Sequence, residues 1–393
     1  MSDGVWVTGI GAVSAAGIGV APLATTLVMG RSAVRSIQSL GCIPAGLAPT
    51  PPRHAAGRHL DRSARFFLQA GEEAFHDARL EDGHFDPRRC GVLEGSSLGA
   101  LADLLTEHAE RGKSAARPSR LVRYMPGAGG AAFAQLHGVR GPVLHLSAGS
   151  VSAAYAIAEG VEKIRSGRLD LVIAGGAECP LHDEVLASFE AAGILGCRDS
   201  GDAPCRPFDA RRQGTVLGEG AGVLILESPT HAHRRGAWPR AVVRGYGMSC
   251  ESYSMTAPDP SGAGVAEAAR EALAGLRGEP GWIKTHGTGT RLNDAAECRG
   301  LANLFGAALA GIPITSLKPA LGHCLGASAA VEAVGAILAL EQGIVPPTLG
   351  SERRDPDLPR YRLATLGCKP AADSVLLLAE SFGGRCAALT LSL

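Results

Sequence analysis

The chain of 393 residues lacks an excess of either charge, a long apolar run and a high content of aromatic residues. Its 38 Lys and Arg residues balance 38 Asp and Glu residues, so the charge gives no indication of binding to nucleic acid or to a membrane surface. No apolar run reaches transmembrane length, and Met1 to Gly4 lead directly into an apolar strand pattern without a signal peptide. We therefore expect a cytoplasmic protein that binds neither nucleic acid nor membranes.

Cysteine pairs at the spacing of metal sites are also absent. The ten cysteines are scattered and none forms a Cys-x-x-Cys pair, which predicts reduced, mostly buried thiols rather than a zinc site or a disulfide scaffold. Hydrophobic residues make up 46% of the chain, and this content excludes global disorder. The 53 glycines indicate tight turns and closely packed elements.

Acidic residues are missing from the N-terminal region, where no Asp or Glu lies between Asp3 and Asp61. This absence decides how the stretch Gly9-Ile10-Gly11-Ala12-Val13-Ser14 is interpreted, because it follows an expected strand at Val5–Thr8 and resembles a dinucleotide-binding turn. Such a turn needs an acidic residue about 20 positions later to bind the ribose. We therefore predict no nucleotide here, and we expect no cofactor or metal elsewhere in the chain.

Strand and helix patterns alternate along the chain, which predicts an α/β architecture with largely parallel sheets. The polar, turn-rich segment Thr230–Pro239 is the best candidate for a linker, and it divides the chain into halves at 1–235 and 236–393. The expected strands are Cys90–Leu93, Val143–Leu146, Leu169–Gly176, Val223–Leu226, Ala241–Gly247, Trp282–Thr285, Ser374–Leu378 and Ala387–Leu391. The expected helices are Arg62–Arg79, Val151–Ser166, Val265–Leu276, Glu297–Leu304 and Ala327–Glu341.

Ser150 lies at the corner between the strand that ends at Leu146 and the helix that begins near Val151. Free backbone N–H groups and the positive end of a helix suit a nucleophile whose acyl adduct needs an oxyanion hole. The simpler interpretation is that Ser150 caps the helix, as serine often does. The stretch alone leaves both interpretations open.

Two histidines in the second half are flanked by glycines. His286 follows a short strand, and His323 precedes a long helix, so each lies where the backbone can approach a ligand. A single histidine is more often structural than catalytic, and no third ligand follows at a spacing that suits a metal. Lys318 and Glu297 could form a pair that holds the two histidine loops together; alternatively, Glu297 is an ordinary acidic residue near a helix start.

A basic segment precedes the turn Met125-Pro126-Gly127. A charged run of this kind forms either a solvated face or a docking surface for an acidic partner. Its basic residues are Arg111, Lys113, Arg117, Arg120 and Arg123.

Five stretches in order resemble the β-ketoacyl synthases of the thiolase superfamily, of the fatty-acid and type II polyketide kind. Together they extend from about residue 4 to the end of the chain, which makes the combination far more specific than any one motif. The stretches are VTGIGAVSAAG, RPFDARRQGTVLGEGAGVLILE, THGTGTRLNDAAE, LKPALGHCLGASAAVEAV and SFGGRCAALTL.

The resemblance implies a five-layer αβαβα fold of two related halves, usually dimeric, with a Cys-His-His site. In that family the cysteine accepts an acyl chain from acyl carrier protein, and the histidines promote decarboxylation of a malonyl thioester. By position, Ser150 stands where the cysteine belongs, and His286 and His323 match the histidines. Lys318 and Glu297 match the supporting pair, and Phe382 matches a gating phenylalanine whose N–H contributes to the oxyanion hole. Acyl carrier protein is the implied partner, with residues 111–123 as the candidate docking face.

The sequence also departs from this family. Ala148-Gly149-Ser150 replaces the usual Thr-Ala-Cys, Arg385-Cys386 replaces the common Thr-Asn, Thr215 replaces an aromatic residue, and Leu378–Ser381 does not match the usual Asn-Ser-Phe-Gly. A serine hydroxyl is a much weaker acid than a thiol and needs a true general base.

Three functions therefore stay open at this point. Ser150 is a working nucleophile in an acyltransferase; or the chain resembles a chain length factor that pairs with a true ketosynthase without being acylated; or the histidines only decarboxylate malonyl thioesters. The first gives a homodimer or a heterodimer, and the second requires a paralogous ketosynthase. A deliberate replacement of cysteine by serine, made to trap a complex, would give the same sequence.

Overall fold

The computed structural model describes residues 4–52, 57, 59–80, 83–111, 118–196 and 203–393. Its main strands follow one hydrogen-bonded order, β12-β11-β10-β13-β14-β9-β1-β8-β7-β5-β6. The strands of the first half are β1 (Val5–Ser14), β8 (Gly220–Glu227), β7 (Leu171–Glu178), β5 (Cys90–Gly95) and β6 (Val143–Leu146). Those of the second half are β9 (Ala241–Cys250), β14 (Arg385–Ser392), β13 (Ser374–Ser381), β10 (Trp282–Lys284), β11 (Pro313–Thr315) and β12 (Arg362–Leu363).

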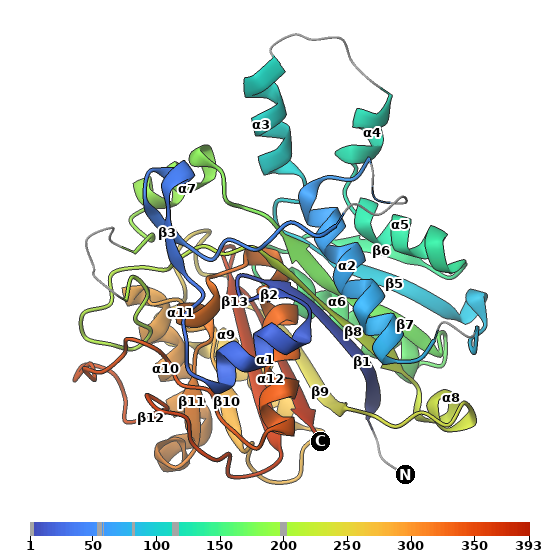
Figure 1. Cartoon of the computed structure of the whole chain (residues 1–393). Helices are drawn as coiled ribbons and strands as arrows, with labels where there is room; N and C mark the ends of the chain where they lie inside the picture. Colours follow the sequence, from blue (N-terminus) through green and yellow to red (C-terminus); the bar gives the residue numbers. More distant parts are fainter. Residues whose placement is uncertain (1–3, 53–56, 58, 81–82, 112–117, 197–202) are drawn as a thin grey trace.

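Helices cover both outer faces and fill the space between the two halves, which gives five layers (Figure 1). The two halves of the sheet meet where the start of β1 pairs with the start of β9. The central layer is α6 (Ser152–Arg165) and α12 (Ser328–Glu341). The outer layers are α2 (Arg62–Asp77) and α5 (Ala128–His137) on one side, and α9 (Ala263–Leu273) and α10 (Arg291–Phe305) on the other. The predicted thiolase-like α/β fold is confirmed.

The remaining elements lie at the ends and edges of the layers. They are β2 (Gly17–Ile18), α1 (Val20–Val28), β3 (Arg35–Ile37), β4 (Ile43–Ala45), α3 (Leu101–Arg111), α4 (Ser119–Arg123), α7 (Asp183–Ala191), α8 (Pro229–Arg234) and α11 (Lys318–Leu321). α8 occupies half of the segment predicted to be a linker, because Ser228 caps a helix there with Pro229 at its first position. The boundaries 1–235 and 236–393 stay a prediction.

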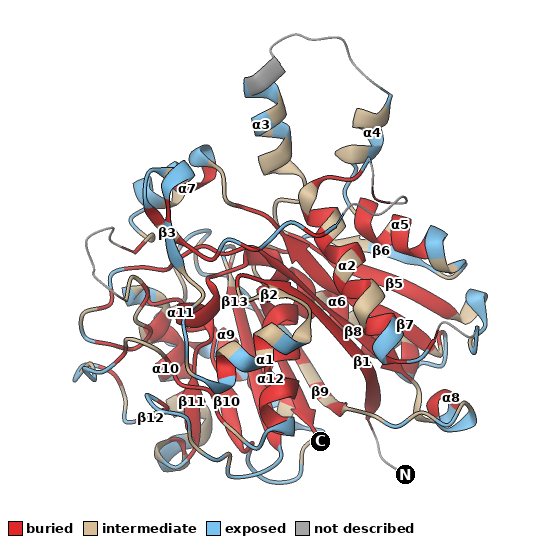
Figure 2. Ribbon diagram, viewed as in Figure 1, coloured by how far each residue is buried: buried red, intermediate tan, exposed pale blue. Residues whose placement is uncertain are grey.

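The central helix α12 is buried along almost its whole length (Figure 2). Every residue of α12 from Ser328 to Leu340 is buried, as expected of a helix that is apolar on all sides and lies between two sheets. Only Ser328 and Glu332 in that run carry polar side chains. Both therefore need partners inside the protein.

The prediction of largely parallel sheets is wrong. The strands at the two outer ends are parallel, as in β5–β6 and β10–β11, whereas β7, β8, β1, β9, β14 and β13 pair with one another in antiparallel fashion. β7, β8 and β13 are buried along almost their whole length, and their sequences are largely apolar. Continuous apolar runs indicate burial on both faces and do not reveal strand direction.

The glycine-rich stretch after Thr8 is not a turn, because β1 continues unbroken to Ser14. A Cβ atom on Gly9 would lie 2.2 Å from the carbonyl oxygen of Ala74, and one on Gly11 would lie 2.0 Å from that of Ala70. These two glycines therefore allow α2 to pack directly against the backbone of β1. The glycines serve helix–sheet contact, with no part in binding phosphate.

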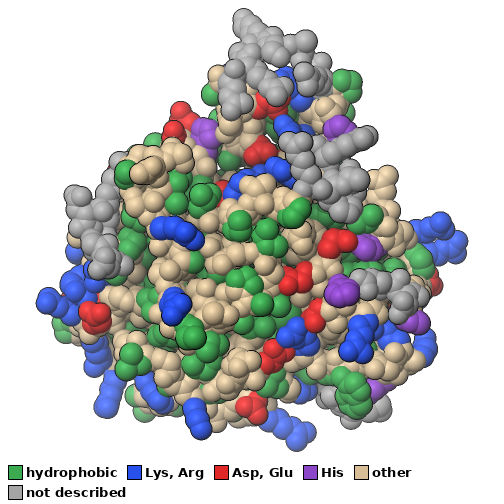
Figure 3. All heavy atoms as spheres, in the orientation of Figure 1, with side chains coloured by type: hydrophobic (Ala, Val, Ile, Leu, Met, Phe, Trp, Pro, Cys, Tyr) green, Lys and Arg blue, Asp and Glu red, His purple; other side chains and the backbone are tan. Residues whose placement is uncertain are grey.

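No helix in the described part of the chain combines the length and apolar character needed to cross a membrane. On the face drawn in Figure 3, basic and acidic side chains are interspersed among apolar ones.

The burial of Glu94 within the sheet can be tested through the pH dependence of stability. It lies on β5, is 4% exposed, and accepts a hydrogen bond of 2.7 Å from the N–H of Gly130. Burial raises the pKa of Glu94 from about 4.5 to about 8, so its contribution to stability is complete below about pH 4.5 and is lost as the pH rises through 8.

We expect Glu94→Gln, which keeps an acceptor but cannot ionise, to be more stable than the wild type at pH 8.5 by about 1 kcal/mol or more. The difference should shrink as the pH is lowered towards 5, and urea unfolding at several pH values measures it. The exposed Glu267 provides a control, since Glu267→Gln should shift stability little at any pH. A Glu94→Gln variant whose stability follows the wild type across this range would contradict the assignment.

Candidate active site

Ser150 lies in the tight connection between β6 and α6, after Gly149 in the left-handed conformation (φ 65°). The interpretation of Ser150 as a helix cap is wrong: α6 begins at Ser152 with Val151 at the cap position. The hydroxyl of Ser152 satisfies the local backbone, since it accepts from the N–H of Ala148 (2.9 Å) and donates to the carbonyl of Gly149 (2.6 Å). The side chain of Ser150 is therefore left for another partner.

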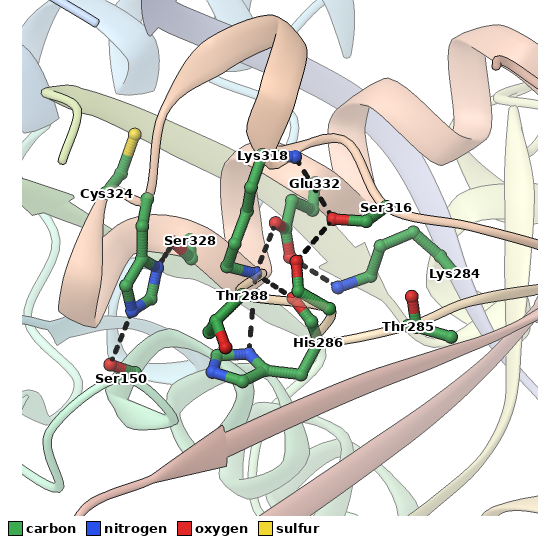
Figure 4. Close-up of polar contacts among 12 residues, drawn as sticks. Ser150, Lys284, Thr285, His286, Thr288, Ser316, Lys318, Cys324, Ser328 and Glu332 are labelled. Atoms are coloured by element: carbon green, nitrogen blue, oxygen red, sulfur yellow. Dashed lines mark hydrogen bonds and ion pairs between the residues drawn. The ribbon is translucent and has the colours of Figure 1, made fainter. Parts of the chain in front are cut away.

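That partner is His323. The Oγ of Ser150 lies 3.0 Å from Nε2 of His323, and Nδ1 of the same ring lies 2.8 Å from Oγ of Ser328 (Figure 4). When Nδ1 donates to Ser328, Nε2 is the acceptor for the hydroxyl of Ser150. The backbone N–H of His323 donates to the carbonyl of Val216 (2.7 Å), which fixes the loop that carries the ring.

His286 stands beside this pair, with its ring centroid 5.3 Å from that of His323 and the two rings nearly perpendicular. Its backbone N–H and that of Gly287 both donate to the carboxylate of Glu297, at 2.5 and 2.8 Å. Glu297 on α10 therefore shapes the loop that follows β10. The structure brings together Ser150, His286 and His323, three residues from distant parts of the chain.

Two lysines share one carboxylate beneath the histidines. Lys318 is bonded to one oxygen of Glu332 (3.0 Å) and Lys284 to the other, and all three side chains are buried. Lys318 also lies 3.4 Å from Nδ1 of His286 and donates to that residue's carbonyl oxygen, while Lys284 donates to the carbonyl of Leu378 (2.8 Å). The group carries one more positive than negative charge.

The predicted pair of Lys318 with Glu297 is therefore wrong. Lys318 is paired with Glu332, and Glu297 accepts backbone N–H groups instead. Both carboxylates follow the histidine motifs on helices, and their spacing in the sequence does not show which one reaches the lysine.

Burial and charge keep both histidines neutral. Desolvation is the main reason that the pKa values of His286 and His323 lie well below 6.5, and the neighbouring lysine charges lower them further. Burial also lowers the pKa of Lys284 to about 8, while Glu332 raises it, so Lys284 is still protonated at pH 7. A neutral imidazole donates a hydrogen bond at one nitrogen and accepts one at the other, as acid–base chemistry requires.

A cavity of about 560 Å³ opens onto these groups. It is lined by residues of both halves, among them Ser150, His286, His323, Thr215 and Phe382. Phe382 is 51% exposed at the end of β13, where a side chain can move without disturbing the core. This position agrees with the gate that the sequence resemblance implies, although its role stays a prediction.

The residue before Phe382 alters the expected oxyanion hole. The backbone N–H of Ser150 donates to Oγ of Ser381 at 2.9 Å. A Cβ atom on Gly149 would lie 2.0 Å from the same oxygen, so the hydroxyl is tightly enclosed. In this conformation the N–H predicted to stabilise an oxyanion is occupied by a side chain of the protein itself.

Two residues of the predicted docking face are engaged within the chain. Arg120 and Arg123 both contact Glu107 of α3, at 2.9 and 3.4 Å, and Tyr124 bonds the same carboxylate. These contacts join α3 to α4, which project together from the body of the molecule (Figure 1). Lys113 and Arg117 lie outside the described residues, as does the side chain of Arg111 at the end of α3. The docking role of the segment stays a prediction.

Four residues of the site were missed from the sequence: Lys284, Ser328, Glu332 and Ser381. Glu332 had a signal, because a glutamate in the middle of an otherwise apolar helix needs a buried partner. Lys284 had a similar signal, because a lysine at the end of an apolar strand also needs a partner if it is buried. Ser328 and Ser381 had none, since a serine near a helix start or a strand end is ordinary.

The fold and this cavity define an α/β enzyme class in which two thiolase-like halves meet around a serine and two histidines. Comparison with known families agrees: residues 41–232 match the N-terminal domain of beta-ketoacyl synthases, and residues 240–352 match their C-terminal domain. The chain belongs to the beta-ketoacyl synthase family, an acyltransferase class.

Two curated relatives illustrate the range of the family. The ketoacyl synthase alpha subunit of the tetracenomycin polyketide synthase of Streptomyces glaucescens is 32% identical and covers 97% of this chain and 95% of its own. Nodulation protein E of Rhizobium meliloti (strain 1021) is 34% identical over 91% of each chain.

Solved structures give the same fold. A beta-ketoacyl synthase from Burkholderia phymatum has a TM-score of 0.90 at 29% identity and covers 99% of each chain. The ishigamide ketosynthase/chain length factor has a TM-score of 0.89 at 30% identity, over 100% of this chain and 99% of that one. A ketosynthase in complex with its type II acyl-carrier protein also has a TM-score of 0.89, at 29% identity over the whole of both chains.

Glu332 offers a direct test of the buried charge group. Glu332→Gln would leave two buried ammonium groups facing a neutral amide, so we expect the free energy of unfolding to fall by about 3–5 kcal/mol. Adding Lys284→Met, which removes one of these two charges, should recover part of this loss. Urea unfolding of the single and double variants measures both effects. A single variant within about 1 kcal/mol of the wild type would show that the group is not held as described.

Proposed function

We propose that the protein is a β-ketoacyl-[acyl carrier protein] synthase homologue that handles acyl thioesters in fatty-acid or polyketide chain elongation, with Ser150 at the position of the nucleophile. The observation that carries this proposal is the distance of 3.0 Å between Oγ of Ser150 and Nε2 of His323 at the wall of the cavity. A hydroxyl needs a base within hydrogen-bond reach, and a neutral histidine meets that need.

In the proposed acylation, Oγ of Ser150 attacks the thioester carbonyl of an acyl group while its proton passes to Nε2 of His323. The tetrahedral intermediate then expels the carrier's thiolate, which takes the proton back from His323, and an oxyester on Ser150 remains. Because the pKa of His323 lies well below 6.5, the base is unprotonated across the neutral range.

In the proposed condensation, both imidazoles donate to the thioester oxygen of a malonyl group. Lys318 donates to Nδ1 of His286, which places that ring's own proton on Nε2, the nitrogen away from the lysine. Loss of carbon dioxide leaves an enolate, which attacks the acyl-serine carbonyl and forms the new carbon–carbon bond. Ser150 leaves as the alkoxide and takes a proton from solvent.

His323 would therefore act as an acceptor in the first step and as a donor in the second. The hydroxyl of Ser328 makes this change possible, because it can accept a hydrogen bond from Nδ1–H or donate one to Nδ1. A carboxylate at that position could only accept, and would hold the ring in one tautomer.

Acyl carrier protein is the proposed partner, and residues 111–123 are its proposed docking face. Support comes from the similar ketosynthase solved with its acyl-carrier protein. Since Arg120 and Arg123 also tie α4 to Glu107, charge reversal there would disturb the local structure as well as any docking. We propose a dimer, either of two copies or with a paralogous ketosynthase.

A second candidate function is that of a partner without acyl transfer, comparable to a chain length factor. The bond from the N–H of Ser150 to Ser381 favours it, because an occupied oxyanion hole opposes acylation. The similar ishigamide protein is a complex of a ketosynthase with a chain length factor. Acylation decides between the two candidates.

Intact-protein mass after incubation with carrier protein loaded with short and medium acyl chains is the first measurement. We expect one added acyl group on the wild type, none on Ser150→Ala, and a faster gain on Ser150→Cys, because a thiolate is the better nucleophile. An unmodified wild type beside an acylated Ser150→Cys would reject the first candidate and support the second.

Ser381 provides a further prediction. Ser381→Gly frees the N–H of Ser150, and because an ordinary hydrogen bond contributes about 1 kcal/mol, the rate of acylation should rise about fivefold to tenfold. The matched variant Ser381→Thr keeps the hydroxyl and should not gain. If Ser381→Gly were acylated more slowly than the wild type, the hydroxyl would instead assist the reaction.

A further inference from the structure

A second group of chemically active side chains lies on the wall of the same cavity. Glu251 follows β9, Glu380 lies on β13 and Cys386 on β14. One ligand atom from each lies within 4.8 Å of the other two. Glu380 and Cys386 are directly opposed in the antiparallel pair β13–β14, so their side chains share one face of the sheet.

Two of the three side chains in this group are deeply buried. Glu380 is 5% exposed and Cys386 is 2% exposed. One carboxylate oxygen of Glu380 and one of Glu251 are buried and have no hydrogen-bond partner among the described residues. No ion pair found among those residues includes either carboxylate, and the other carboxylate oxygen of Glu251 accepts from the N–H of Asp259 (2.9 Å). Burying such oxygens without a partner destabilises the folded protein.

Nearby cations do not fill this gap. Arg385, the residue before Cys386, bonds the carbonyl of Phe382 (3.3 Å). Burial is the main reason that the pKa values of Glu380, Glu251 and Cys386 are all raised. The charge of Glu251 raises the pKa of Glu380 further, and both carboxylates raise that of Cys386. A single cation bound between them would reverse this effect on all three groups at once.

We infer that Glu251, Glu380 and Cys386 form a binding site for a divalent transition-metal ion of the zinc type. A thiolate with two carboxylates suits zinc, which takes sulfur at about 2.3 Å and carboxylate oxygen at about 2.0–2.2 Å. Glu380 is only 5% exposed, and one of its carboxylate oxygens has no partner among the described residues. This unpaired oxygen indicates a missing ligand, which the grouping of acidic residues alone would not.

All three side chains line the cavity, so an ion bound between them would lie at the wall of the cavity that also holds Ser150 and the histidines. Three protein ligands and one open position are typical of zinc sites that bind a small molecule. An oxygen of water or of an acyl chain in the cavity would complete the coordination. Binding would release the protons held by the thiol and the carboxyl groups.

The sequence pattern predicts no metal in the chain, and it could not indicate this site because the ligands come from separate positions, 251, 380 and 386. The inference is independent of whether Ser150 is acylated. It therefore needs a measurement that does not depend on enzyme activity.

We would strip the full-length protein with a chelator, equilibrate it with zinc chloride, and measure bound metal per chain by mass spectrometry after gel filtration. One zinc ion per chain is the expected result. Cys386→Ser and Glu380→Gln should each bind zinc at least tenfold more weakly. Cys250→Ser, which changes an exposed thiol at the end of β9, is the matched control and should bind like the wild type.

Cobalt(II) on the wild type gives a second measurement that does not depend on how well the variants fold. Coordination through Cys386 predicts a sulfur-to-cobalt charge-transfer band that zinc removes by competition. Wild-type protein that takes up neither metal, or variants that bind zinc as tightly as the wild type, would overturn the inference. In that case the two carboxyl groups are simply protonated in the folded protein.

Discussion

The carboxylate of Glu332, shared by Lys318 and Lys284, is the interaction on which the rest of the site depends. It fixes Lys318, which holds the carbonyl and the ring of His286, and it fixes Lys284, which holds the backbone of β13 two residues before Glu380. One side chain of the central helix therefore sets the position of a histidine loop and of a cavity strand together. The surplus positive charge also disfavours protonation of both histidines.

Much of the fold was predictable because long stretches with regularly spaced apolar residues form helices and strands where the spacing predicts them. β6 has the predicted bounds, Val143–Leu146, and α2 and α6 begin or end within two residues of prediction. Strand direction was not predictable, since strands covered on both faces are apolar in either direction. The role of Gly9 and Gly11 was also hidden, because only the position of α2 shows that a side chain there would collide with a helix.

The site was predictable in part. Ser150, His286 and His323 stand among small residues at strand–helix junctions, and the structure brings them together. The partner of Lys318 was not predictable from spacing, because Glu297 and Glu332 follow the two histidines at similar intervals. Contacts that cross between the halves, such as Ser150 with Ser381, depend on how two distant segments face each other. The sequence around each residue does not show which distant segment it will contact.

The hairpin of β13 and β14 concentrates several properties of the cavity in a few neighbouring positions. Glu380, Ser381 and Phe382 successively contribute an unpaired carboxylate, a hydroxyl against the serine corner, and a half-exposed ring at the cavity. They lie at the end of β13, where the strand reaches the cavity wall. For evolution, this hairpin tip is a short stretch in which single substitutions can change reactivity, ligand choice and access.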